Sequence, residues 1–305
     1  MAAKRTVGIV GLGIMGGAFA GNLLKSSWRV IGYDTDKKRN RALRRLGVEI
    51  ALDVAALAAA TPTIITSLPH PAALDVTVAA IAGAKLPRRV LIEMSTFALD
   101  DKLRAERALA QAGHTMLDCP VSGTGSQAKT KDIVIYASGD HGSIKELSPL
   151  FKAFARAVHD LGAFGNGSRM KFVANLLVAI HNVASAEAMV LGMKAGLRPE
   201  LIHDMVRTGA GNSRVFELRA PMMVTGRYDE PTMKVEVWQK DMQVIDAFAR
   251  SLGCPTPLFA ATRPVYNAAL ATGHAGHDTA CVCAVLEAMA EVKRMRGQRR
   301  RLRRS

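Results

Sequence analysis

The sequence predicts an α/β protein in which a Rossmann-type, doubly wound parallel sheet is followed by an all-α helical domain, with a long interdomain helix joining the two. Three observations predict this fold class. Short β-branched runs alternate with helical stretches through the first half, a glycine-rich turn follows the first run, and strand-like alternation ends after Gly165. Repeated β–α units imply parallel strands that are covered by helices on both faces of a sheet.

The individual elements follow from local composition. Runs rich in valine, isoleucine and threonine predict strands over residues 6–10, 30–33, 63–67, 90–94, 116–118 and 133–137, with a last one near Val158. Alanine-rich or amphipathic stretches predict helices over 18–26, 37–46, 51–60, 72–82, 99–112 and 144–155. The stretch 168–195 holds no proline and a single glycine, which predicts one long helix. Further helices are expected over 200–207, 235–252, 257–271 and 278–296.

The length of 305 residues is enough for two compact domains, because a single hydrophobic core rarely grows past about 250–300 residues. A hydrophobic content of 49% with 22% charged residues excludes a disordered chain. We expect a dinucleotide-binding domain over residues 1–165, an all-helical substrate and oligomerisation domain over 166–296, and a basic disordered tail over 297–305.

The formal net charge of +15 is concentrated at the C-terminus, where residues 293–305 hold eight cations and no anion. Such a block is typical of a solvated, frayed tail, and weak attachment to RNA, DNA or another acidic surface is the alternative. Aromatic residues are absent from this tail, which removes the stacking platforms that single-strand binders use. Nucleic acid is therefore not an expected partner beyond weak contact through the arginine-rich tail.

Targeting and redox features favour a cytoplasmic protein that does not span a membrane. The longest early uncharged run, residues 6–24, contains six glycines, which is atypical of a spanning helix or a signal peptide. Four cysteines do not make a disulfide framework, which indicates a reducing compartment. Cys281 and Cys283 form a C-x-C pair without a second pair at metal spacing, so no metal site is expected.

The run Gly11-Leu12-Gly13-Ile14-Met15-Gly16 joins the first expected strand to the first helix as G-x-G-x-x-G. Gly11 permits a tight turn, Gly13 lets the backbone touch a pyrophosphate, and Gly16 allows close helix–strand packing. The pyrophosphate then lies at a helix N-terminus, where free N–H groups and the helix dipole favour an anion. We therefore expect this run to bind a dinucleotide cofactor.

Asp34 ends the next strand, where a carboxylate accepts hydrogen bonds from the adenosine ribose hydroxyls. It would repel a 2′-phosphate, so NAD is preferred, while Lys37-Lys38-Arg39 could neutralise that phosphate and leave NADP possible. Ser67-Leu68-Pro69 and Met94-Ser95-Thr96 end two further strands, and ligands lie beyond the carboxyl ends of such strands. Leu68, Pro69 and Thr96 are therefore candidates for the cofactor rim.

The segment Asp118-Cys119-Pro120-Val121-Ser122-Gly123-Thr124-Gly125 follows another strand. Ser122, Gly123 and Thr124 offer successive backbone N–H groups and two hydroxyls. Such an arrangement forms a nest that can hold a carboxylate, which makes these three residues substrate-binding candidates.

Ser168 is expected to cap the long helix, which places Lys171 in its first turn. The helix dipole disfavours a positive charge there, and with partial burial it would lower the pKa of Lys171 toward a value useful for proton transfer. Asn175 lies four residues on and faces the same way. Lys171 and Asn175 are therefore the catalytic candidates, and Asn175 is also a candidate for binding substrate.

A later helix carries Lys240 next to a core stripe formed by Trp238, Met242, Ile245 and Ala249. From this spacing alone Lys240 faces away from the core and is a surface lysine.

Together, in this order and spacing, these segments resemble the β-hydroxyacid dehydrogenase family over residues 5–292. The family includes 3-hydroxyisobutyrate dehydrogenase, tartronate semialdehyde reductase and threonate dehydrogenase. Its glycine signature is similar to residues 11–16, and its substrate motif is similar to residues 118–123. The resemblance implies that Lys171 is the catalytic lysine, that Asn175 binds substrate, and that Lys240 lies near the nicotinamide. It also implies a homodimer or a homotetramer.

The chain departs from the family where Thr124 and Lys131 replace glycines, and a side chain at position 124 could reshape the carboxylate nest. Ala210-Gly211-Asn212-Ser213 and Phe216-Glu217 are more similar to the branch that acts on four-carbon sugar acids such as threonate than to the 3-hydroxyisobutyrate branch.

The predicted activity is hydride transfer between NAD(P) and the hydroxyl-bearing carbon of a small β-hydroxy acid related to 3-hydroxyisobutyrate, threonate or tartronate semialdehyde, with Lys171 as general acid/base. One alternative is an imine reductase of the same architecture, in which another residue replaces the lysine. The other is a non-catalytic nucleotide-binding module that docks on nucleic acid through the arginine tail. The retained Lys171–Asn175 pair favours the dehydrogenase.

The long helix predicted over residues 168–195 is too apolar for one small domain to cover easily, so an oligomer is expected.

Overall fold

The structure is a computed structural model that describes residues 5–294. It divides the chain into two compact units, with the boundary after Asn175, inside the long helix α9 (Asn166–Lys194). The basic tail expected over 297–305, and the expected end of the helical domain at residue 296, lie outside the described residues.

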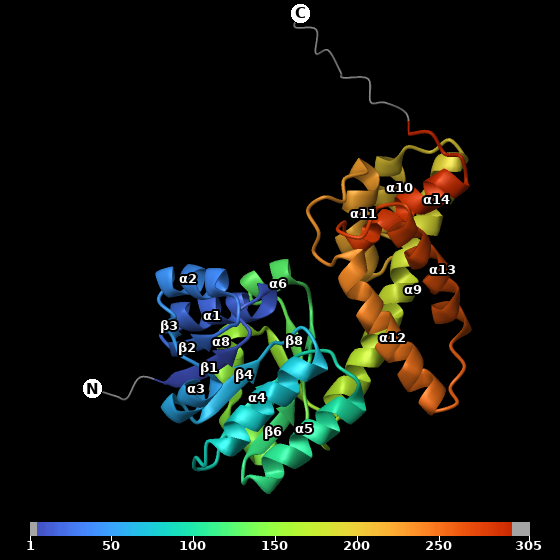
Figure 1. The fold of residues 1–305 in the computed structure, drawn as a ribbon. Coiled ribbons are helices and arrows are strands. Elements are labelled where there is room, and N and C mark those ends of the chain that lie inside the picture. The colour runs from blue at the N-terminus through green and yellow to red at the C-terminus, as the bar shows by residue number, and fades with distance from the viewer. Residues whose placement is uncertain (1–4, 295–305) are drawn as a thin grey trace, which may run out of the picture. The chain divides into compact units, whose positions relative to one another are not determined.

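The first unit contains a six-stranded sheet whose strands span Thr6–Val10 (β1), Arg29–Tyr33 (β2), Glu49–Ile50 (β3), Thr63–Thr66 (β4), Val90–Glu93 (β5) and Thr115–Asp118 (β6). The order in the sheet is β3-β2-β1-β4-β5-β6, and every neighbouring pair is parallel (Figure 1). The chain moves outward from β1 through β2 and β3, then returns to the other side of β1 with β4. In doubly wound sheets, ligands bind at the carboxyl ends of the strands where the order reverses in this way.

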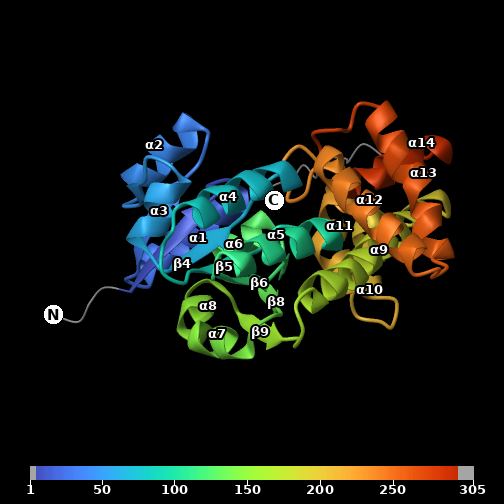
Figure 2. The same ribbon diagram turned by 60° about the horizontal axis from the view of Figure 1, so that its bottom comes forward.

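Successive strand residues point to opposite sides of the sheet, and helices cover both faces. Ile65 and Ile92 enter one core with helices α1 (Ile14–Lys25) and α8 (Ser148–Phe154), whereas their neighbours Ile64 and Leu91 enter a second core. The second core is closed by α3 (Val54–Ala60), α4 (Pro71–Gly83) and α5 (Leu99–Gln111) (Figure 2). The predicted fold class, a parallel sheet between two layers of helices followed by helices, is confirmed.

The last strands of the unit form a separate sheet. Its strands span Val121–Ser122 (β7), Val134–Ala137 (β8) and Ala157–Asp160 (β9), with β7 antiparallel and β9 parallel to β8. Helix α6 (Gly125–Lys129), which lies between β7 and β8, was not predicted from the sequence. The single helix expected over 144–155 is wrong, because α7 (His141–Glu146) ends before Pro149 and α8 starts a new helix around that proline. The basic helix α2 spans Lys37–Arg45, as expected within a residue.

The described part of the second unit is helical, apart from an isolated bridge between Lys234 and Asp278. After α9 come α10 (Pro199–Val206), α11 (Arg214–Thr225), α12 (Val235–Ser251), α13 (Pro257–Ala271), the 3₁₀ turn η1 (Thr279–Cys281) and α14 (Val282–Met289). The core stripe predicted on α12 is buried as expected. The last helix was expected to reach residue 296, but it ends at Met289, and Glu291 has a positive φ of 52° that a helix does not allow.

By length and composition alone, α9 could cross a membrane, with a mean hydropathy of 1.6 over its most apolar 18 residues. The core helix of a soluble protein passes the same test, so this is weak evidence. The helix also carries buried polar side chains, among them Lys171, Asn175 and Asn182, and Asn182 donates hydrogen bonds to Tyr266 and to the carbonyl of Thr279.

Candidate functional site

The glycine turn leaves one stretch of backbone open at the start of α1. Gly11 has a φ of +91°, and a Cβ there would lie 2.2 Å from the carbonyl oxygen of Ser67. A Cβ on Gly16 would lie 1.9 Å from the carbonyl oxygen of Gly11. A Cβ on Gly13, in contrast, would meet nothing closer than an Arg39 nitrogen at 3.5 Å. Two glycines are thus required by packing, while Gly13 leaves room for a phosphate group at the helix N-terminus.

Asp34 lies at the end of β2 and is buried against this turn. Its carboxylate accepts hydrogen bonds from the backbone N–H of Leu12 at 2.7 Å and of Asp36 at 2.8 Å. The half-exposed Arg39 guanidinium lies 3.4 Å from the same carboxylate. Of the three basic residues that follow Asp34, Arg39 is therefore the one the structure pairs with it, whereas Lys37 and Lys38 are exposed. The Asp34 carboxylate and the Arg39 guanidinium therefore both lie where the sequence predicts contacts with the adenosine ribose.

The two strand ends predicted as the cofactor rim lie side by side on the parallel strands β4 and β5. The backbone N–H of Leu68 donates to Ser95 Oγ at 2.8 Å, which joins the two segments directly. Pro69 and Thr96 follow within one residue of this contact. The carbonyl oxygen of Ser67 is the atom that a Cβ on Gly11 would meet. The structure therefore brings the rim and the glycine turn together.

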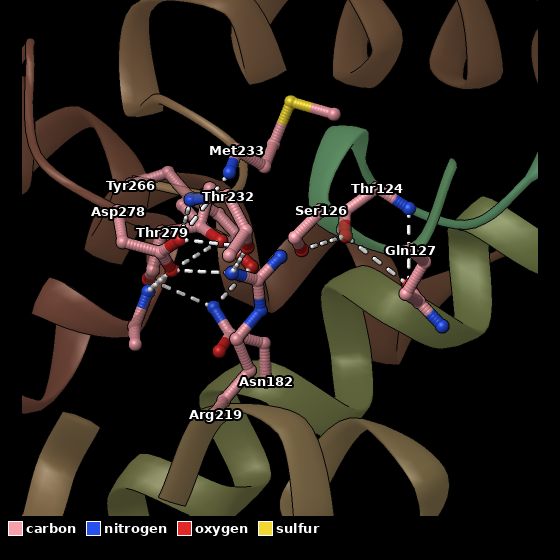
Figure 3. Close-up of polar contacts among 11 residues, drawn as sticks. Thr124, Ser126, Gln127, Asn182, Arg219, Thr232, Met233, Tyr266, Asp278 and Thr279 are labelled. Carbon is pink, nitrogen blue, oxygen red and sulfur yellow. Dashed lines mark hydrogen bonds and ion pairs between the residues drawn. The ribbon is translucent and has the colours of Figure 1, made fainter. Parts of the chain in front are cut away.

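The segment predicted to hold a carboxylate borders the same turn. A Cβ on Gly125 would lie 2.2 Å from Ile14 Cγ2, so this segment and the glycine run are in contact. Thr124 begins α6, and its N–H donates to Gln127 Oε1 at 3.0 Å while its hydroxyl contacts Ser126 Oγ at 2.9 Å (Figure 3). The Thr124 φ of −98° is ordinary, so a threonine strains nothing here. The Thr124 hydroxyl also donates to Gln127 Oε1 at 3.2 Å, so both polar groups of Thr124 take part in the cap of α6.

The start of α9 differs from the prediction. The helix begins at Asn166, with its first backbone bond from the N–H of Arg169 to the carbonyl of Gly165, so Ser168 is not the cap. Instead the Asp118 carboxylate accepts from the Ser168 N–H at 2.7 Å and from its hydroxyl at 2.9 Å. An anion at a helix N-terminus satisfies free N–H groups and the dipole. Spacing alone could not show that this anion comes from a strand 50 residues away.

Lys171 therefore lies in the second turn of α9 rather than in the first. Its side chain is buried, and Asn175, one turn further on, is buried as well. The two belong to one face of the helix because residues four apart are neighbours on a helix surface. Both remain in the first unit, together with the glycine turn, the cofactor rim and the segment 122–124.

A buried charge cluster that was not predicted from the sequence lies next to these residues. Lys102 of α5 has no exposed side-chain surface, and its Nζ lies 2.6 Å from Glu93 Oε2 and 2.7 Å from Asp118 Oδ1. Burial alone would lower the pKa of Lys102, but the carboxylates of Asp118 and Glu93 raise it well above its ordinary value. One signal was present in the sequence, since Lys102 shares the apolar face of α5 with Ala105 and Leu109.

In the second unit, Lys240 lies on α12 and forms an ion pair with Asp241 at 3.0 Å. About a third of its side chain is exposed, so Lys240 is partly buried rather than the fully exposed surface lysine that spacing alone predicts. Segment 210–213 leads into α11, where Ser213 caps the helix by accepting from the Phe216 N–H at 3.0 Å. Asn212 donates to Glu217 Oε1 at 2.9 Å, and together with Arg214 it holds the pKa of Glu217 below its ordinary value.

A fully buried aspartate organises the same unit. Asp278 pairs with the Arg219 guanidinium and accepts hydrogen bonds from the N–H groups of Thr232, Met233 and Ala280 (Figure 3). These contacts tie α11, the segment before α12 and the turn η1 to one carboxylate. Among residues 5–294, no group of three or more His, Cys, Asp or Glu side chains is placed to hold a metal ion.

Comparison with known proteins places both units in one family. Residues 6–162 match the NAD-binding domain of 6-phosphogluconate dehydrogenase, and residues 165–286 match the NAD-binding domain of NADP-dependent 3-hydroxyisobutyrate dehydrogenase. The chain is 31% identical to an L-threonate dehydrogenase of Cupriavidus necator over 92% of its own length and 95% of the relative. It is 25% identical to a 2-(hydroxymethyl)glutarate dehydrogenase of Eubacterium barkeri, covering 96% of this chain and 98% of that one.

A solved structure agrees with this placement. The crystal structure of 3-hydroxyisobutyrate dehydrogenase from Salmonella typhimurium superposes with a TM-score of 0.83 at 29% identity, covering 92% of this chain and all of that one. The family matches, together with the Rossmann-type sheet and its glycine turn, define the class, an NAD(P)-dependent oxidoreductase. Within that class, the chain belongs to the β-hydroxyacid dehydrogenase family, as its resemblance predicted.

Proposed function

We propose that the protein oxidises a small β-hydroxy acid, or reduces the corresponding carbonyl acid, with Lys171 as the general acid/base. The observation that carries this proposal is the burial of Lys171 and Asn175 on one face of α9, in the unit that also holds the glycine turn. A bound nicotinamide cofactor supplies the hydride chemistry. In oxidation the neutral Lys171 Nζ accepts the alcohol proton, and in reduction the ammonium returns it to the carbonyl oxygen. Such proton transfer contributes about 10²–10⁴-fold.

The other site residues have supporting roles in this proposal. Gly11-Leu12-Gly13-Ile14-Met15-Gly16 would hold the pyrophosphate, Asp34 the adenosine ribose, and Leu68, Pro69 and Thr96 the cofactor rim. The hydroxyls of Ser122 and Thr124 and the backbone of Gly123 would bind the substrate carboxylate, and Asn175 would orient the substrate hydroxyl. Lys240 is assigned to the nicotinamide end by resemblance. The buried Asp34 carboxylate supports NAD as the preferred cofactor.

For the substrate, we propose a four-carbon sugar acid of the threonate type. The support is the similarity to an L-threonate dehydrogenase together with the sequence of segment 210–217. A panel of threonate, 3-hydroxyisobutyrate, glycerate and 2-(hydroxymethyl)glutarate, assayed with NAD and NADP, tests the choice. A higher kcat/KM for any of the other three acids than for threonate would contradict it.

We also propose a division of labour between the two parts of the chain. Residues 1–165 would bind the dinucleotide and residues 166–296 would serve substrate binding and assembly into a homodimer or homotetramer. A soluble protein of the cytoplasm is consistent with this assignment, with α9 as a core helix rather than a membrane span.

The decisive experiment is Lys171→Ala. We expect turnover to fall by several orders of magnitude while the cofactor still binds, because the change removes the proton donor and leaves the glycine turn intact. Stopped-flow turnover and fluorescence titration with NADH would measure the two quantities. Lys194→Ala, at the exposed end of the same helix, is the matched control. Near wild-type turnover in Lys171→Ala would eliminate the mechanism.

A further inference from the structure

The buried ion cluster of Lys102, Glu93 and Asp118 has two arms that reach different parts of the proposed site. On one arm, Glu93 Oε1 accepts from the Ser95 N–H at 2.9 Å, and Ser95 Oγ accepts from the Leu68 N–H at 2.8 Å. These are residues of the cofactor rim.

On the other arm, Asp118 accepts both the N–H and the hydroxyl of Ser168, in the turn of α9 that precedes Lys171. A second contact supports this arm, because Ser138 Oγ accepts from the N–H of Gly167 and donates to Asp118, whose carbonyl oxygen lies at 3.2 Å and whose carboxylate lies at 3.4 Å. Two successive residues of the first turn of α9 are therefore bound through Asp118.

Lys102 is the group that joins the two arms. An ammonium offers three hydrogen-bond donors, and here it lies within 2.7 Å of a carboxylate oxygen from each arm. All three side chains have no exposed surface, so solvent cannot take over this link.

We propose that Lys102 is a positioning residue for the reaction: it holds the cofactor rim and the start of α9 at a fixed separation, and so holds Lys171 in register with the cofactor. The inference rests on the proposed role of Lys171. A displacement of about 1 Å in a reacting group is enough to cost about 10²-fold in rate.

A purely stabilising role accounts for this cluster less well. Buried ion pairs often contribute no more stability than apolar side chains of similar volume, because desolvation offsets the attraction. What an ion cluster adds over apolar packing here is direction, since each hydrogen bond fixes the orientation of its donor and acceptor. Loss of Lys102 is therefore expected to affect geometry separately from stability.

Two variants separate these effects. Lys102→Met fills the same space without charge and leaves two unpaired carboxylates, so we expect a lower melting temperature and a kcat at least 10-fold below wild type. Lys102→Met combined with Glu93→Gln returns the buried net charge to that of the wild type but does not rebuild the link. We expect the melting temperature of the double variant to recover in part, because one buried carboxylate without a counter-charge remains instead of two, while its kcat stays low.

The readouts are kcat and KM for the best acid of the substrate panel, NADH affinity, and the melting temperature. Arg294→Met, which breaks the ion pair with Glu287 in the second unit, is the control for stability loss alone and should retain wild-type kcat. Recovery of kcat together with the melting temperature in the double variant would overturn the proposal.

A milder change keeps the test valid if Lys102→Met does not fold. Ser168→Ala removes one hydroxyl donor from Asp118 and keeps every charge, so we expect a several-fold lower kcat with little change in KM. Wild-type kcat in both Ser168→Ala and the double variant would contradict the positioning role. Lys171→Ala, assayed in parallel, distinguishes this outcome, because full activity in that variant removes the proposed function itself.

Discussion

Asp34 and Arg39 present opposite charges to the adenosine end of the proposed cofactor site. The Asp34 carboxylate is buried and has a fixed orientation, because two backbone N–H groups hold it. The Arg39 side chain is half exposed and lies over the open backbone of Gly13 as well as beside Asp34. A fixed anion and a more exposed cation therefore compete in the choice between a ribose hydroxyl and a 2′-phosphate.

Asp34→Ser should shift the preference toward NADP. Removing the carboxylate removes its repulsion of a 2′-phosphate and releases Arg39 to pair with one. We expect the ratio of kcat/KM for NADP to that for NAD to rise at least 10-fold. Asp36→Ser is the control, since Asp36 also lies near Arg39 but is exposed. An unchanged ratio in Asp34→Ser would show that this carboxylate does not select the cofactor.

Lys131, one of the two departures from the family pattern, has a strained backbone conformation. Its φ of +62° lies in the left-handed region, where glycine is favoured and a side chain costs about 1 kcal/mol. Thr124, the other departure, has an ordinary φ and no such cost. The two replacements of glycine therefore differ: Lys131 strains the backbone, whereas Thr124 adds a hydroxyl and a methyl group without backbone strain.

Lys131→Gly should raise the free energy of unfolding by about 0.5 kcal/mol, because the greater freedom of the unfolded chain offsets only part of the relieved backbone strain. Urea denaturation measures this change. Lys129→Gly, in the last turn of α6, is the matched control and should lower stability, because glycine disfavours a helix. A loss of stability in both variants would contradict the strain argument.

At the scale of elements, the sequence predicted those whose signal is local. The strands β1, β2, β4 and β5 and the helices α12 and α13 were found within about one residue, because each carries a β-branched run or a helical period of its own. The two-residue strands β3 and β7 carry no such period. Helix α11 contains Pro221, which reads as a helix break, although the structure accommodates it inside the helix.

The candidate site was predictable where its residues are neighbours in sequence, and not where they meet through the fold. The glycine run, Asp34 and the pair Lys171–Asn175 follow from spacing. The cap on α9 and the ion cluster depend on Asp118, Glu93 and Lys102, which lie on three different elements. Only the parallel pairing of β5 with β6 brings those two carboxylates together.

Asp278 is a buried carboxylate that joins several elements of the second unit. Asp278→Asn should lower the free energy of unfolding by about 3–5 kcal/mol, because it leaves the buried Arg219 guanidinium without its counter-charge. Chemical denaturation followed by circular dichroism measures the loss. Asp229→Asn, an exposed position nearby in sequence, should change it by less than about 0.5 kcal/mol. Equal stability of the two variants would contradict this role for Asp278.

At the scale of the whole molecule, one face of α9 carries exposed apolar side chains along its length. Met170, Val173, Leu177 and Leu191 are between 37% and 73% exposed, and alanines 184 and 188 continue the row. This row is self-complementary. An antiparallel pair of α9 helices centred between residues 180 and 181 would set Met170 opposite Leu191, Val173 opposite Ala188 and Leu177 opposite Ala184, large side chains over small ones.

Leu191→Arg should therefore weaken the proposed oligomer. A charge placed in a two-fold apolar contact is repeated on both copies, so we expect the sedimentation equilibrium to shift toward smaller species. Leu252→Arg is the matched control, since Leu252 is 64% exposed just after α12 and lies away from the row. A wild-type protein that sediments as a monomer, or equal masses for both variants, would contradict the assembly.

The joining of three charges in one core also constrains how the chain can change over evolutionary time. Substituting any one of positions 93, 102 and 118 leaves a buried charge without its partner, so each single substitution in this cluster lowers stability. We expect lineages that lose the lysine to have lost an acid as well, and the three positions to co-vary across descendants of a common ancestor. Whether the acid at position 93 or the acid at position 118 is lost first would show which arm of the cluster, the one to the cofactor rim or the one to α9, is given up first.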